Sequence, residues 1–141
     1  DKNATFEFGK ANILLDGTDV TLVANGLLVW EAIKASEQLK KDGISARVIN
    51  MHTIKPIDAE ILVKSAKETG LIITCEDHQK HGGLFSAVAE VIVQNKPVPM
   101  DYIAVNDTFG ESGTMEELME KYQINTKAII KKVKKNLIRK K

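Results

Sequence analysis

The stretch DVTLVANGLLVWEAIKASEQLKKDGISARVINM, residues 19–51, decides the fold class of this chain. Residues 19–24 form a short apolar run typical of a buried strand, and residues 45–51 form a second one. Between them, residues 27–41 carry apolar side chains at helical spacing, and Asp42-Gly43 ends this helix. A strand, a helix and a second strand in this order predict a crossover unit on a parallel sheet.

The same alternation continues toward the C-terminus. Asp58 is expected to cap a helix that Gly70 ends, and residues 71–75 predict a third buried strand. Residues 84–94 predict a helix that is apolar around most of its circumference, as for a helix between two layers. Residues 100–105 predict a last strand. We therefore expect an α/β fold, a three-layer α/β/α sandwich with a mostly parallel sheet.

The C-terminal segment is expected to form two helices. Thr114 and Glu117 have capping-box spacing and predict the start of a short helix, and a final helix is expected to begin near Thr126. Eight basic residues and no acid follow position 126, so residues 1–126 carry a net charge of −7 in a chain of net charge +1. Because Ile129 and Val133 recur at helical spacing among the lysines, we interpret this segment as a solvated helix face and predict no nucleic-acid partner.

Composition excludes several classes of protein. The chain has 141 residues, of which 43% are hydrophobic and 28% charged, which suits a single globular domain over residues 1–141. No apolar run approaches the roughly 20 residues of a membrane span. We therefore expect no membrane partner and a soluble, cytoplasmic protein. The chain begins with Asp1 rather than methionine, and we expect it to be a piece of a longer subunit.

Polar residues gather where the predicted strands end, which is where open parallel sheets bind ligands. The glycines before the 84–94 helix can expose backbone N–H groups to an anion such as phosphate. Alternatively, these glycines serve close packing, and the acidic and histidine side chains make only structural hydrogen bonds. The candidate anion-binding or interface loop consists of Asn25, Glu76, His78, His81, Gly82 and Gly83.

The spacing of Cys75, His78 and His81 invites a zinc interpretation, but no fourth ligand completes a tetrahedral set nearby. Cys75 also ends a predicted buried strand, which favours an inert thiol over a nucleophile. We therefore predict no metal ligand and no nucleophilic cysteine. Glu76 with His78 stays open as an acid/base or orienting pair if both side chains project into one cleft, with purely structural hydrogen bonds as the alternative. Trp30 lies off the main apolar stripe of its helix and suits a subunit contact, or else a helix edge partly covered by its neighbours.

Seven short sequence phrases keep a characteristic order and spacing: residues 9–11, 19–21, 24–26, 43–56, 76–78, 82–84 and 107–113. Together they resemble the C-terminal domain of transketolase as found in the C-terminal subunit of split transketolases, a branch of the thiamine-diphosphate-dependent enzymes. The resemblance covers nearly the whole chain, from about Phe8 to the final helix, and implies a five-stranded mixed sheet. A short first strand near Asn12–Leu15 would run antiparallel to the other four.

The resemblance also implies a function for the whole enzyme. Such an enzyme transfers a two-carbon ketol unit between sugar phosphates on thiamine diphosphate with Mg²⁺, bound between a pyrophosphate-binding and a pyrimidine-binding domain. This chain resembles neither domain and lacks the family's Gly-Asp-Gly motif. The resemblance therefore implies no catalytic residue in this chain, and we expect the chain to bind no cofactor and to be inactive alone. Its implied role is to pack against those domains and to extend the interface of a homodimer or higher assembly.

Other interpretations stay open at this point. Deoxyxylulose phosphate synthase and the β subunit of 2-oxoacid dehydrogenases contain an equivalent domain, although residues 50–56 and 109–113 look more like transketolase. A regulatory anion-binding module is a further alternative, with the candidate loop as its site.

Overall fold

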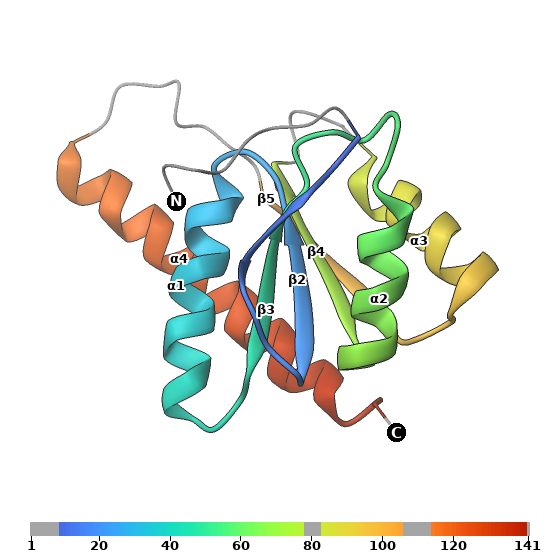
Figure 1. The fold of residues 1–141 in the computed structure, drawn as a ribbon. Coiled ribbons are helices and arrows are strands. Elements are labelled where there is room, and N and C mark those ends of the chain that lie inside the picture. The colour runs from blue at the N-terminus through green and yellow to red at the C-terminus, as the bar shows by residue number, and fades with distance from the viewer. Residues whose placement is uncertain (1–8, 78–82, 106–113, 141) are drawn as a thin grey trace.

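The computed structural model describes residues 9–77, 83–105 and 114–140 (Figure 1). Its five strands form one sheet in the order β1-β3-β2-β4-β5, in which β1 is antiparallel to β3 and the other pairs are parallel. The elements are β1 (Asn12–Leu15), β2 (Val20–Ala24), α1 (Leu28–Lys41), β3 (Ala46–Asn50), α2 (Ala59–Thr69), β4 (Ile72–Asp77), α3 (Leu84–Asn95), β5 (Met100–Val105) and α4 (Met115–Leu137). The five-stranded mixed sheet with an antiparallel first strand is confirmed.

Helices cover both faces of the sheet. Figure 1 shows α1 and α4 on one face and α2 and α3 on the other. Because successive side chains of a strand point to opposite faces, the central strand β2 supplies both cores. Leu22 packs with Leu39 and Val133 on the first face, and Val23 packs in the second cluster. This arrangement confirms the three-layer sandwich.

Local sequence signals begin and end the helices as predicted. The Asp58 carboxylate accepts a hydrogen bond from the backbone N–H of Ile61 at 3.3 Å, which caps α2, and Gly70 ends that helix with a φ of 72°. At the start of α4, the Thr114 hydroxyl accepts from the Glu117 N–H, and the Glu117 carboxylate accepts from the Thr114 N–H, both at 3.1 Å. The capping box is therefore formed.

The prediction of two separate C-terminal helices is wrong, because α4 runs without a break through Thr126. No glycine or proline lies between Thr114 and Leu137 to end the helix. Thr126, Ile129 and Val133 are all buried. Their packing outweighs the low helix propensity of threonine, and the segment stays helical.

Two further elements differ from expectation. Strand β4 continues to Asp77, so Glu76 belongs to the strand rather than to the following loop. Helix α3 buries one stripe that contains Leu84, Val88 and Ile92, whereas Val93 is 68% exposed. In the described residues, α3 is thus packed on one side only and not between two layers.

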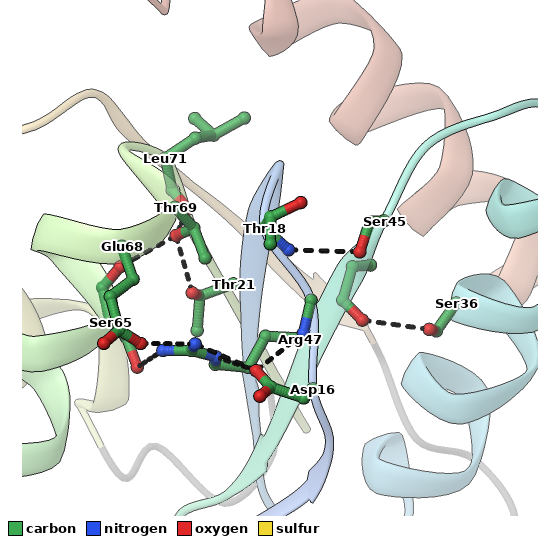
Figure 2. A network of polar contacts seen from close by, with 12 residues as sticks. Asp16, Thr18, Thr21, Ser36, Ser45, Arg47, Ser65, Glu68, Thr69 and Leu71 are labelled. Carbon is green, nitrogen blue, oxygen red and sulfur yellow. Dashed lines mark hydrogen bonds and ion pairs between the residues drawn. The ribbon is translucent and has the colours of Figure 1, made fainter.

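A polar network holds β3, α2 and the turn between β1 and β2 together at the amino ends of the parallel strands (Figure 2). Arg47 is 4% exposed, and its guanidinium lies between carboxylates on two sides. It donates to Asp16 at 2.9 Å, to the Ser65 hydroxyl at 3.0 Å and to Glu68 at 2.6 Å. Since an arginine is rarely buried unless it is paired, these contacts allow Arg47 to lie inside the fold.

A candidate docking face at the carboxyl ends of the parallel strands

The structure brings Asn25 and Glu76 to the same edge of the sheet. In the parallel pair β2 and β4, Ala24 lies opposite Cys75, so Asn25 and Glu76 follow side by side. The Asn25 N–H donates to the Cys75 carbonyl at 3.3 Å, and the Asn25 carbonyl accepts from the Leu28 N–H at 3.2 Å, where α1 begins. Three other members of the candidate loop lie outside the described residues: His78, His81 and Gly82.

Glu76 caps helix α3. Its two carboxylate oxygens accept from the Leu84 N–H at 3.2 and 3.3 Å. Gly83, the residue before the helix, has a φ of 65° and offers no side-chain cap, so the carboxylate comes from the neighbouring strand. A negative charge at a helix N-terminus stabilises the helix by about 0.3–1 kcal/mol. The position at which an external anion would meet α3 is thus taken by the chain's own Glu76.

Cys75 lies in the core of the fold, out of reach of solvent. Its side chain is fully buried, and burial raises the pKa of the thiol to about 12, because the thiolate would lose its hydration. The prediction that Cys75 is buried is confirmed, and the raised pKa disfavours the thiolate form that a nucleophile needs. Within the described residues, no three His, Cys, Asp or Glu side chains converge in a way that could hold a metal ion.

Two large apolar side chains lie at the surface beside this edge. Leu27, directly before α1, is 42% exposed, and Trp30 in the first turn of α1 is 65% exposed. Tryptophan is enriched at protein–protein interfaces because its indole buries a large area with few rotatable bonds. We name Asn25, Leu27, Trp30 and Glu76 the strand-end face. Its use as a contact surface, like that of the candidate loop, stays a prediction.

Residues 9–129 match the family model described as the C-terminal domain of transketolase. The chain belongs to the transketolase C-terminal domain family. The resemblance stated from the sequence phrases is therefore confirmed.

Relatives agree with this assignment. The 6-deoxy-6-sulfo-D-fructose transketolase subunit SqwH of Clostridium sp. (strain MSTE9) is 44% identical over 92% of this chain and 40% of its own length. A putative transketolase C-terminal section of Methanocaldococcus jannaschii is 46% identical over 94% of this chain and 42% of its own length. The transketolase C-terminal domain described here thus spans about two fifths of the length of these two relatives.

A solved chain of a split-gene transketolase, described as an inactive β4 tetramer, has the same fold. It is 42% identical to this chain, with a TM-score of 0.83, and the match covers 100% of this chain and 45% of that one. More than half of that chain therefore has no counterpart in the present sequence.

The family implies thiamine diphosphate and a metal ion, and the N-terminus of α3 does not fit the pyrophosphate of that cofactor. Glu76 occupies the N-terminus of α3, and its negative charge opposes a second anion there. No metal-ligand cluster lies among the residues that the structure describes. We therefore derive no chemical step through the cofactor on this chain.

Sequence reasoning did not single out Arg47. A signal was present, because a charged residue inside an apolar strand requires partners when it is buried. Its partners Asp16 and Glu68 lie 31 and 21 residues away along the chain, so the sequence alone did not identify them.

None of the helices in the described residues is long and apolar enough to cross a membrane.

Proposed function

We propose that this chain is the C-terminal assembly domain of a split transketolase, and that its strand-end face docks onto the domains that bind the cofactor. One observation carries the proposal. At the edge of the sheet where ligands usually bind, Glu76 is bonded to the chain's own helix, while Trp30 is 65% exposed. This edge thus offers a contact surface for another protein surface rather than a small-molecule site.

In this proposal the whole enzyme transfers a two-carbon ketol unit between sugar phosphates, and the domain alone is inactive. Thiamine diphosphate with Mg²⁺ supplies the carbanion chemistry when it is bound between the pyrimidine- and pyrophosphate-binding domains. The residues of this chain position those domains. The Clostridium relative is named for a sulfonated sugar, so membership of the family leaves the sugar open.

Self-association is part of the same proposal. The split-gene relative with a TM-score of 0.83 is described as an inactive β4 tetramer. This supports a homodimer or higher assembly of the subunit that contains this domain, and a need for other subunits before activity appears.

Calorimetric titration tests the proposal. The chain is titrated with thiamine diphosphate and Mg²⁺ alone, and again after mixing with the pyrimidine- and pyrophosphate-binding parts of a related split transketolase. We expect no heat of binding from the chain alone and clear binding in the mixture. Cofactor binding by the chain alone, or a mixture that binds no better than its other parts without this chain, contradicts the proposal.

A matched pair of variants tests the docking face. Trp30→Ala is expected to weaken association with the other parts about tenfold, as the loss of a central interface aromatic does. The control is Ile138→Ala, because Ile138 is 85% exposed at the far end of the chain. Equal effects of the two substitutions would remove the strand-end face from the proposal.

A further inference from the structure

A furrow with a high positive charge runs between the C-terminal halves of α1 and α4. It has a volume of about 850 Å³, and its lining includes Lys41 and Asp42 from the end of α1 and Ile130 from α4. Four lysines of α4 also line the furrow: Lys127, Lys131, Lys134 and Lys135. The furrow lies at the opposite end of α1 from Trp30, so it is separate from the strand-end face.

Most of these lysines have no negative partner. Lys134 forms an ion pair with Asp42 at 2.8 Å. Among the residues that the structure describes, Lys41, Lys127, Lys131 and Lys135 form neither an ion pair nor a hydrogen bond through the side chain. All are exposed. Like charges that converge on one furrow repel each other, so a ligand that brings negative charge relieves this repulsion.

The spacing of the charges suits an extended polypeptide. Lys127, Lys131 and Lys135 follow one another at intervals of four residues, which places them about 6 Å apart along the helix axis. In an extended chain, alternate side chains lie about 6.6 Å apart. Acidic residues at every second position can therefore match successive lysines along α4.

The apolar part of the lining adds a second requirement. Ile130 and the aliphatic stems of the lysines supply apolar surface beside the charged ammonium groups. An extended segment that alternates acidic and apolar residues presents its two kinds of side chain to opposite sides. Its apolar side can face Ile130, and its carboxylates can stay near the ammonium groups.

We propose that this furrow binds an extended segment of a partner protein in which acidic and apolar residues alternate. Nucleic acid suits the furrow less well. The residues that line it include neither an aromatic side chain nor an arginine, and binding of single strands relies on stacking against such groups.

Fluorescence anisotropy with a labelled peptide tests this proposal. The probe is Glu-Leu-Glu-Val-Glu-Leu-Glu, titrated with the purified chain at low ionic strength, and the comparison peptide has glutamine in place of every glutamate. We expect binding of the first peptide only, weakening as salt shortens the Debye length from about 10 Å at 0.1 M to about 3 Å at 1 M. The double variant Lys131→Glu with Lys135→Glu should bind about tenfold more weakly.

The control variant is Lys67→Glu with Lys96→Glu. It changes the net charge by the same amount, but both residues are exposed on the α2 and α3 layer, across the sheet from the furrow. Thermal unfolding verifies that both variants are folded. An equal loss in the control, equal binding of the glutamine peptide, or tighter binding of an oligothymidylate of similar length would each overturn the proposal.

Discussion

The two ends of the parallel strands use their polar residues differently. At the amino ends, Arg47 is bonded to Asp16, Ser65 and Glu68, and the Thr21 and Thr69 hydroxyls meet at 2.7 Å (Figure 2). At the carboxyl ends, Glu76 caps the N-terminus of α3, whereas Trp30 in the first turn of α1 is 65% exposed. The polar groups at the amino ends are therefore paired within the chain, whereas the carboxyl ends leave a large apolar side chain exposed.

This difference separates stability from assembly. A buried guanidinium must be fully paired, because removing it from water costs several kcal/mol. The turn between β1 and β2 and helix α2 supply those partners. An exposed indole needs no partner within the fold, and its burial by another protein stabilises the complex. The following predictions test this separation, beginning with the largest expected effect.

Substitution at Arg47 should destabilise the fold most. We expect Arg47→Ala to lower the free energy of unfolding by about 3 kcal/mol, because it removes a buried charged partner together with its aliphatic packing. Urea denaturation measures the change. The matched control is Lys64→Ala on the exposed side of α2. A loss below about 1 kcal/mol would mean that the network acts like ordinary surface ion pairs.

Substitution at Trp30 should show the opposite pattern. Trp30→Ala is expected to change the free energy of unfolding by less than about 0.5 kcal/mol, because an exposed side chain loses few contacts within the chain. The same variant should lose about 1.4 kcal/mol of association free energy, which is a factor of ten. Denaturation of the isolated chain and sedimentation of the mixture measure the two quantities. A large loss of stability would place the indole in the fold rather than in an interface.

Substitution at Glu76 should have an intermediate effect on stability. Glu76→Ala is expected to cost about 1 kcal/mol, because it leaves the Leu84 N–H without its cap. Glu76→Gln keeps an acceptor but removes the charge, so its cost should be smaller. Thermal unfolding of the two variants separates the hydrogen bond from the interaction with the helix dipole. An unchanged Glu76→Ala variant would show that the cap contributes nothing.

The smallest effect should be a dependence on pH at the amino ends. The Gly17 N–H, and after it the Arg47 guanidinium, hold the pKa of Asp16 below its ordinary value of 3.8. The unfolded chain therefore takes up this proton first as the pH falls, and the contribution to stability is present above pH 3.8 and lost as the pH drops through the lowered pKa. Asp16→Asn should flatten the acid limb of the stability curve. An identical curve would assign the acid dependence to other carboxylates.

Much of the fold could be predicted from short sequence signals. The apolar runs of β2 and β3, the cap at Asp58 and the stop at Gly70 each depend on residues a few positions apart, and the structure contains all of them. The break expected at Thr126 failed because packing of α4 against α1 and the sheet outweighed a local preference. A local signal is sufficient only where no long-range contact opposes it.

For the candidate site, the sequence indicated the correct edge of the sheet but not the contacts there. Asn25 and Glu76 lie side by side as predicted, whereas the bond from Glu76 to Leu84 depends on how β4 and α3 meet. His78 and His81 lie outside the described residues, so their part in the candidate loop stays a prediction.

The sequence by itself determined the order of strands and helices as far as β5, the burial of Cys75 and the family to which the chain belongs. Periodicity, caps and motif phrases are local properties, so they can be recognised from nearby residues without knowing which distant residues pack against them. The tertiary structure alone decided which polar groups are satisfied: Arg47 by Asp16, Ser65 and Glu68, and α3 by Glu76. It also brought the lysines of α1 and α4 to one furrow. Except for Glu76 and Leu84, which are 8 positions apart, these pairings join residues far apart in the chain, so only packing of the layers creates them.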